Sequence, residues 1–376
     1  MNTERKRAAA FITATLAAAC STDSPEPTVT PDQSADRPWA ASPPVVPVLE
    51  ATTGDEALLS YIWDLGMDSR GHIYVVDFQE PGVIELNADL GYERTIGREG
   101  EGPGEFGRTA TVQLLPGDSV LVWDSRLQRL TLFPPGSGDV LSVHSLGTQE
   151  GSGTTWKLPG SAGYLALSST AYQADGSDQG ETRTAVLRLV REEDGRAVDE
   201  VIFSYPAAEM LVLREEGAVS VSGHPFGRQS FVDILGDGRI VYASSDALEV
   251  KIIDLTGEVQ TAFSYPTTYL AVSRRDLAAA AEELGRDLGR ALREGAPYVW
   301  PSLTGLVVDD QSRIWVGIRD VDLSKWEWAA FLPDGTHQLS VELPAEFEVY
   351  AIGGGRMIGV EQGELDIPRI RAYRLP

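Results

Sequence analysis

The sequence is poor in the side chains that build disulfides and metal centres. Its 376 residues include one cysteine, Cys20, four histidines and two asparagines, Asn2 and Asn87. A lone cysteine excludes an intramolecular disulfide and a cysteine-based metal site. The four histidines are scattered along the chain, so no zinc site is expected. We therefore expect no bound cofactor, with a calcium ion held by carboxylates and carbonyls as the alternative.

Motifs of covalent catalysis are missing as well. The chain has no G-x-S-x-G nucleophile motif, no clear Ser/His/Asp order and no C-x-x-C-H haem attachment motif. The glycine-rich stretch "IGREGEGPGEFGR" (96–108) lacks a P-loop lysine, and its three glutamates would repel phosphate. We interpret it as a connector between structural units, with Phe106 packed between them. These absences favour a binding protein over an enzyme.

The charge balance is strongly acidic. The formal net charge is −25 and the isoelectric point is about 4.5. Such a surface repels nucleic acid and anionic lipid headgroups, so neither is an expected partner. Basic or neutral partners are favoured instead.

The N-terminus has the organisation of an export signal. Three basic residues at 5–7 precede an apolar run at 8–19, which is too short to cross a bilayer, and then Cys20. Residues 1–19 resemble a bacterial lipoprotein signal peptide, which implies a lipid on Cys20 and a location at the cell envelope. An ordinary secretory signal followed by an incidental cysteine is the alternative. Residues 20–44 are rich in Pro, Ser, Thr and Asp and are expected to be a disordered tether.

The rest of the chain, 45–376, repeats a pattern of tight turns and β-rich runs. Six segments combine a polar turn with a Val-, Ile-, Tyr- or Trp-rich run: 68–77, 115–124, 158–167, 235–244, 309–318 and 352–361. A second kind of turn alternates with them, so that each unit carries two hairpins. This repeat predicts an all-β, six-bladed β-propeller. The last unit lacks one strand, which we expect residues 44–53 to supply.

One segment departs from the β pattern. Residues 273–294 are predicted to form a helix that Ser273 caps and Pro297 ends. Its apolar stripe is expected to pack on the flank or face of the propeller, with a partner-binding role as the alternative.

Several motifs carry a family resemblance. The stretch "GMDSRGHIYVVDFQEPGVIELNADLGYERTIGREGEGPGEF" resembles an NHL-type propeller blade. The stretches "PSLTGLVVDDQSRIWVGI", "FLPDGTHQLSVELP" and "IGVEQGELDIPRIRAYRL" are similar to bacterial six-bladed propeller lipoproteins of largely unassigned function. The resemblance implies a propeller fold but no particular activity. We expect the protein to be a monomer.

The connections between strands are unequal, and strand alternation places the long ones together. We call this end the long-loop face; its connections include 78–82, 169–183, 319–328 and 361–369. Long loops on a rigid scaffold are frequent binding sites. The candidate ligand-binding residues on this face are Arg98, Arg108, Asp124, His224, Arg228, Trp300, Arg319 and Trp326.

These candidates have alternative interpretations. The arginines would bind an anion or pair with nearby carboxylates, and Trp300 and Trp326 would grip a peptide or a sugar. Asp77 and Asp124 would either form a carboxylate pair at the channel or cap the loops that follow them, and their repetition favours capping.

The predicted function is a binding or scaffold module for a peptide, glycan or protein partner. The alternative is a metal-dependent lactonase- or lyase-like hydrolase with calcium in its channel.

Overall fold

The architecture was described from a computed structural model of the whole chain. The described residues are 37–39, 44–54, 59–145, 152–160, 163–169, 182–193, 196–215, 218–267, 269–296, 298–319, 321, 323–363 and 367–376. The predicted signal peptide, Cys20, Pro297 and most of the tether lie outside them.

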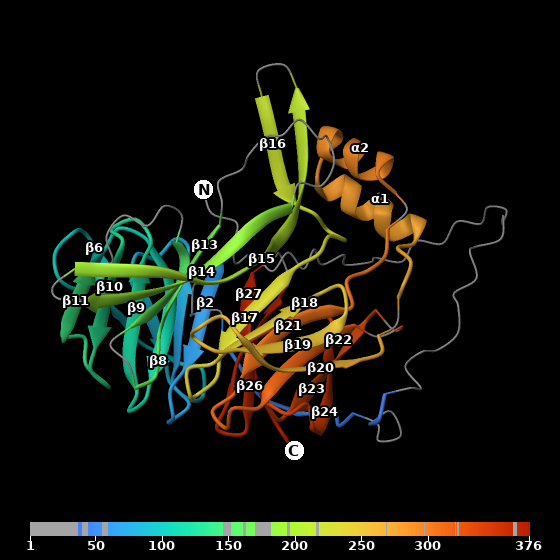
Figure 1. Cartoon of the computed structure of the whole chain (residues 1–376). Helices are drawn as coiled ribbons and strands as arrows, with labels where there is room; N and C mark the ends of the chain where they lie inside the picture. The colour runs from blue at the N-terminus through green and yellow to red at the C-terminus, as the bar shows by residue number, and fades with distance from the viewer. Residues whose placement is uncertain are drawn as a thin grey trace.

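Nearly all regular structure in the described residues is β, in six antiparallel sheets (Figure 1). The first sheet contains β2 (Ile62–Met67), β3 (Ile73–Asp77), β4 (Val83–Leu86) and β5 (Tyr92–Ile96). The second contains β8 (Thr109–Leu115), β9 (Ser119–Asp124), β10 (Arg129–Phe133) and β11 (Ser142–Ser145). The third contains β12 (Ser152–Lys157), β13 (Tyr164–Ser169), β14 (Thr182–Glu193), β15 (Arg196–Glu215) and β16 (Ala218–Gly223).

The other three sheets follow the same order along the chain. The fourth contains β17 (Ser230–Ile234), β18 (Ile240–Ser244), β19 (Leu248–Ile253) and β20 (Val259–Tyr265). The fifth contains β21 (Leu303–Val308), β22 (Ile314–Arg319), β23 (Lys325–Phe331) and β24 (His337–Pro344). The sixth contains β25 (Phe347–Gly353), β26 (Arg356–Gln362), β27 (Pro368–Arg374) and β1 (Val48–Thr52).

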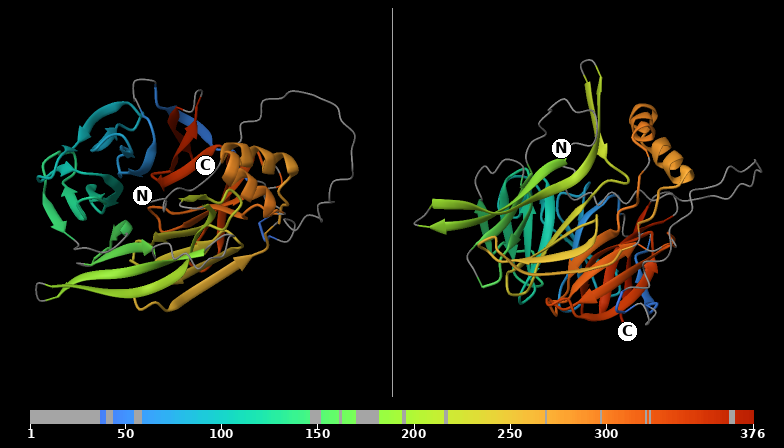
Figure 2. Two further views of the ribbon diagram at one scale, coloured as in Figure 1. Left: turned by 90° about the horizontal axis from the view of Figure 1, so that it is seen from above. Right: turned by 45° about the vertical axis from the view of Figure 1, so that its right-hand side comes forward.

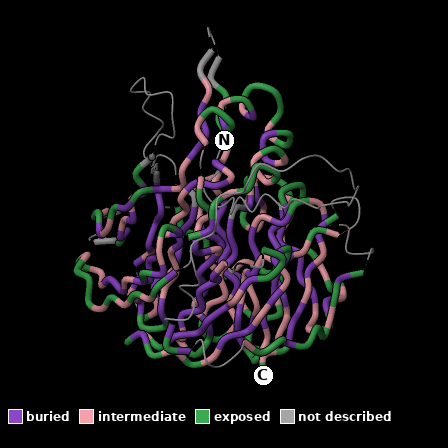
Figure 3. Tube along the Cα trace, turned by 90° about the vertical axis from the view of Figure 1, so that its right-hand side faces the viewer, coloured by how far each residue is buried: buried purple, intermediate pink, exposed green. Residues whose placement is uncertain are grey.

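Each sheet packs face to face on the next. Buried hydrophobic clusters join the first sheet to the second, the second to the third, and so on to the sixth. A further cluster joins the sixth sheet back to the first. The sheets therefore close a ring around an axis, as the view from above shows (Figure 2). Buried residues concentrate along the strands, whereas many turn residues are exposed (Figure 3).

The ring is closed by strand pairing as well as by packing. β1 pairs antiparallel with β27, with Val48 opposite Arg374 and Thr52 opposite Arg371. The N-terminal strand thus supplies the outermost strand of the C-terminal sheet, which confirms the expectation from residues 44–53. This pairing covers an edge that would otherwise present open backbone groups.

The connector at 96–108 has its own small ribbon, in which β6 (Arg98–Glu99) pairs in parallel with β7 (Glu105–Phe106). Gly97 and Gly104 adopt positive φ values of 83° and 74°, which glycine tolerates without strain. Phe106 is fully buried in the cluster between the first and second sheets, as predicted. The stretch also contains G-x-G-x-x-G spacing, but it leads into strand β8 rather than into a helix.

The helical insertion differs from the prediction of one helix over 273–294. It forms two helices, α1 (Arg274–Glu283) and α2 (Arg286–Glu294), because Gly285 between them has a φ of 79°. The predicted cap is confirmed: the Ser273 hydroxyl accepts a hydrogen bond from the Asp276 backbone N–H at 3.1 Å. The predicted apolar stripe packs with Leu211 of β15 and with Phe226. The helices and the β15–β16 arm lie on the same side of the ring, opposite the C-terminus (Figure 1).

Candidate functional site

A cavity of about 950 Å³ runs along the axis of the ring. Its walls are the first strands of the six sheets: β2, β8, β12, β17, β21 and β25. The lining extends from Trp63 and Gln229 near the long-loop face to Gly117 and Gly354 in the short turns of the opposite face. The cavity is therefore a channel that follows the length of the inner strands.

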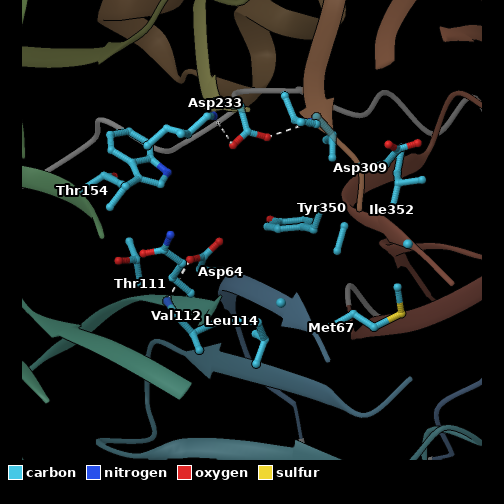
Figure 4. A pocket seen from close by; sticks show the side chains of 18 of the residues that line it. Asp64, Met67, Thr111, Val112, Leu114, Thr154, Asp233, Asp309, Tyr350 and Ile352 are labelled. Carbon is cyan, nitrogen blue, oxygen red and sulfur yellow. Dashed lines mark hydrogen bonds between the residues drawn. The ribbon is translucent and has the colours of Figure 1, made fainter. Parts of the chain in front are cut away.

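Two aspartates on different walls of the channel are anchored by backbone hydrogen bonds (Figure 4). The Asp64 carboxylate accepts the Val112 N–H at 3.0 Å, and the Asp233 carboxylate accepts the Val308 N–H at 2.8 Å. In each case the donor belongs to the next sheet of the ring. These bonds orient the carboxylates and link neighbouring sheets at the same time.

Other polar side chains of the lining make similar links between sheets. Gln113 accepts the Lys157 N–H at 2.7 Å and donates to the Lys157 carbonyl at 3.1 Å. Asp310 accepts the Gly354 N–H at 2.9 Å, and Asp118 accepts the Ser69 N–H at 2.8 Å. Much of the polar lining thus has a structural role in holding the ring together.

Acidic and aromatic side chains of the lining give the channel its chemical character. Carboxylates come from Asp64, Asp233 and Glu348, and aromatic surface comes from Trp156 and Tyr350. Figure 4 shows the ring of Tyr350 pointing into the same space as the two aspartates. Carboxylates beside aromatic rings suit a ligand that carries a positive charge or several hydroxyl groups.

One lysine also belongs to the lining. Lys157 lines the channel, and its ammonium lies 4.6 Å from the centroid of the Tyr164 ring. Burial lowers the pKa of Lys157 below its usual value, because the charged form is poorly solvated there.

None of the eight candidate ligand-binding residues lines this channel. Asp124 is committed to the backbone: it accepts the N–H groups of Gly107, Arg108, Arg126 and Leu127 at 2.6 to 3.2 Å. Asp77 makes the corresponding bonds to Ser60, Tyr61 and Gln79. The structure therefore bears out the capping interpretation of these two aspartates.

Two of the candidate arginines pair with carboxylates. Arg98 forms an ion pair with Glu105 at 2.7 Å within the 96–108 connector. Arg228 lies 3.7 Å from Asp246. These contacts agree with the alternative in which the arginines pair with neighbouring acids.

The other two arginines lie over aromatic rings. The Arg108 guanidinium is 5.5 Å from the Trp63 ring centroid and 5.1 Å from that of Phe78. Arg319 is 4.6 Å from the Trp300 ring centroid and 5.5 Å from that of Trp326. Neither guanidinium forms an ion pair with any residue of the described ranges.

His224 and Trp300 belong to the base of the helical insertion. The Nδ1 atom of His224 accepts the Phe226 N–H at 3.1 Å, and its ring lies 4.8 Å from that of Tyr298. Trp300 packs edge-on against Phe226 at 4.9 Å. Burial lowers the pKa of His224, and the nearby Glu209 carboxylate opposes this only in part. Both side chains therefore support the insertion.

The channel residues that sequence reasoning missed are Asp64, Asp233, Glu348 and Tyr350. Each is a polar side chain or a tyrosine within the first strand of a repeat, as in "YIWDLGM" and "SFVDIL". Attention to polar residues in these strands, rather than in the long loops, would have identified them.

Within the described part of the chain, one trio of potential metal ligands lies close together, and it is outside the channel. Atoms of His72, Glu85 and Glu93 fall within 4.8 Å of one another. Arg94 donates to Glu85 at 2.6 Å, and His72 lies 3.2 Å from it. Burial raises the pKa of Glu85, but the hydrogen bonds from Arg94 and His72 outweigh this effect and hold it below its usual value. The carboxylate already has a cationic partner, so the trio does not suit a metal.

No helix in the described ranges is long and apolar enough to span a membrane.

No family model and no curated protein matches the sequence. Among solved structures, the chain is similar to a protein from Bacteroides fragilis described as exported, with 11% identity over 87% of this chain and 94% of that one and a TM-score of 0.49. It is similar to the calcium-binding protein regucalcin from Agrobacterium tumefaciens, with 12% identity, coverages of 88% and 97% and a TM-score of 0.44. It is also similar to the β-propeller domain of Cps50 (Swd1) from Myceliophteria thermophila, with 9% identity, coverages of 88% and 100% and a TM-score of 0.42. The structures similar to this chain are β-propeller proteins.

Proposed function

We propose that the protein is a six-bladed β-propeller that works as a binding or scaffold module at the bacterial cell envelope. In this proposal the six sheets are the blades, and a lipid on Cys20 holds the monomeric propeller at the membrane. The partner is a peptide, a glycan or a protein that docks on the long-loop face and inserts a group into the channel.

The channel is the observation that carries the proposal. Its volume of about 950 Å³ lies within the range of ligand-binding cavities, and a few polar groups converge on it. Asp64 and Asp233 are held in place by the backbone of neighbouring sheets, so a ligand would not have to pay for ordering them. The carboxylates favour a basic side chain, an amine or a hydroxyl-rich group as the inserted part.

The experiment compares a panel of basic peptides and neutral oligosaccharides by calorimetry with the full-length chain. Tyr350→Ala removes aromatic surface inside the channel, and Tyr92→Ala is the control because Tyr92 is exposed on the outer strand β5. A ligand of the channel should bind at least about tenfold more weakly to Tyr350→Ala and unchanged to Tyr92→Ala. Equal binding to both variants would remove the channel from the proposal.

The long-loop face is tested with the same ligand. The double variant Arg228→Ala/Trp300→Ala alters two candidate residues of this face that lie outside the channel. Weaker binding of the double variant, with the ring still folded by circular dichroism, supports docking on this face. Unchanged binding would mean that the ligand enters from the opposite end.

The lipid anchor has a separate test. Cys20→Ser removes the thiol that would carry the lipid, and the variant should move from the membrane fraction to the soluble fraction. Retention of Cys20→Ser in the membrane fraction would contradict lipidation. The hydrolase with a channel calcium remains an alternative from the sequence, and addition of calcium to the chain in calorimetry would test it.

A further inference from the structure

Arg319 occupies an unusual position on the long-loop side of the fifth sheet. It is the last residue of β22, and its backbone N–H bonds to the Ser302 carbonyl at 2.9 Å. Its side-chain Nε donates to the Pro301 carbonyl at 3.0 Å. The guanidinium lies over the rings of Trp300 and Trp326. Strand pairing therefore holds the backbone of Arg319, and the hydrogen bond to Pro301 and the two rings hold its side chain.

Within the described residues, nothing balances the charge of this guanidinium; the two acids that follow it, Asp320 and Asp322, lie outside those residues. No carboxylate of the described residues lies within 4.0 Å, and Nη1 and Nη2 have no acceptor among those residues. Burial lowers the pKa of Arg319 to about 10, so the group is still protonated at neutral pH. Arg319 is half-buried, and a charge with reduced hydration is normally paired in proteins, because an unpaired one loses hydration without compensation.

Two further hydrogen-bonding groups beside Arg319 also lack partners. The Trp300 indole Nε1 and the Ser302 hydroxyl are buried, and neither has a hydrogen-bond partner in the described structure. An indole N–H can only donate, and a serine hydroxyl can donate or accept. Arg319 contacts the segment 300–302 through its backbone N–H, its Nε and the Trp300 ring, and this segment carries two unsatisfied polar groups. A guanidinium and an indole N–H without acceptors in the described residues match an anion rather than a cation.

The donor groups of Arg319 that remain free within the described structure limit which anions fit. The N–H groups of a guanidinium lie in its own plane and form a fork that matches two adjacent oxygens. With Nε bonded to Pro301, the Nη1 and Nη2 groups remain for an acceptor with two oxygens side by side. A carboxylate and a phosphate share this arrangement of oxygens.

We propose that Arg319, Trp300 and Ser302 form a binding site for an oxyanion, the carboxylate or phosphate group of a small ligand. None of the three residues lines the channel, so this site is separate from the proposed channel site, although Trp300 also belongs to the candidate docking face. In a chain with a net charge of −25, such a site is a local exception to the repulsion of anions.

The test titrates the full-length chain with sodium acetate and, separately, with inorganic phosphate, at a constant ionic strength set with sodium chloride. Calorimetry measures binding, and the thermal unfolding midpoint gives an independent readout because a ligand of the folded state raises it. Saturable binding of acetate alone would identify a carboxylate site, and saturable binding of phosphate alone would identify a phosphate site. Binding of both would identify a general oxyanion site.

Variants assign the binding to these residues. Arg319→Lys keeps the charge but loses the two-pronged donor, and should weaken binding at least about tenfold. Ser302→Ala removes one donor from a buried position, and should weaken binding by roughly fivefold. The matched control is Arg239→Lys, because Arg239 is paired with Asp237 at 2.7 Å in the short turn between β17 and β18. It should leave the affinity unchanged.

Two results would overturn the proposal. One is the absence of saturable binding of either anion to the folded wild-type chain. The other is an affinity that Arg319→Lys and Ser302→Ala leave unchanged. If Arg319→Lys does not fold, Ser302→Ala decides alone, since the loss of one hydroxyl leaves the strand pairing intact.

Discussion

Asp64 and Asp233 lie on sheets three places apart in the ring, and each carboxylate accepts a backbone N–H of the following sheet, at 3.0 and 2.8 Å. A hydrogen bond to a charged group contributes about 1.5–3 kcal/mol to stability. We therefore expect Asp64→Ala and Asp233→Ala each to lower the free energy of unfolding in urea by about that amount. The Asn variants keep an acceptor oxygen and should lose less. An Ala variant as stable as wild type would contradict the linking role.

Phe106 tests the packing between the first and second sheets. It is fully buried in their shared cluster, so Phe106→Ala should cost about 3–5 kcal/mol of unfolding free energy. Tyr92→Ala, at a side chain that is 54% exposed, should change it by less than about 0.5 kcal/mol. Similar urea midpoints for the two variants would show that Phe106 does not hold these sheets together.

Gly289 sets the approach of the two helices. Alanine has a helix propensity about 1 kcal/mol better than glycine, but a Cβ at 289 would lie 1.9 Å from the Ala281 carbonyl oxygen. The clash with backbone should dominate, and Gly289→Ala should lower the thermal midpoint of the insertion. Ala278→Gly, at an exposed site of α1, measures the propensity effect alone. A stabilised Gly289→Ala variant would show that the helices can move apart freely.

Removal of β1 tests the closure of the ring. Chains of residues 44–376 and 54–376 differ by the segment that contains β1, which pairs with β27. The shorter chain should have the lower unfolding midpoint and aggregate more readily, because β27 becomes an open edge. Light scattering and thermal unfolding measure both effects. Equal midpoints would mean that packing alone closes the ring.

The lowered pKa values of two histidines predict a loss of stability in mild acid. Burial lowers the pKa of His337, which stacks on Trp39 at 4.6 Å, as it does that of His224. Each therefore binds a proton more weakly in the folded state than in the unfolded state, where the pKa is about 6.5. The stability that these two neutral histidines contribute is complete above about pH 6.5. It is lost as the pH falls toward their pKa values in the folded state.

The measurement is the unfolding free energy between pH 8 and pH 5.5. His337→Phe keeps a ring against Trp39 but cannot titrate, so its stability should fall less steeply with acid than that of wild type. An identical slope for wild type and His337→Phe would exclude His337 as a source of acid sensitivity.

Local patterns in the sequence were sufficient to predict the all-β character of the chain and its turns. Turn residues such as Gly71 and Gly238, each with a positive φ, mark the ends of hairpins whatever the rest of the chain does. The missing strand of the last repeat predicted the pairing of β1 with β27. The break at Gly285 escaped prediction, because the apolar stripe continues across it and only the packing of the two helices reveals the bend.

The residues of the candidate site could not be predicted in the same way. In the sequence, Trp300 looks like a loop residue that could bind a ligand. In the structure it packs against Phe226, which lies 74 positions earlier in the chain. Asp64 and Asp233 look like ordinary strand residues, and the ring brings them to one channel. The sequence by itself determined the repeat, the turns and the strand that closes the ring, because these depend on neighbours along the chain. The tertiary structure decided which polar groups meet, because the closure of six sheets sets contacts between residues of distant repeats.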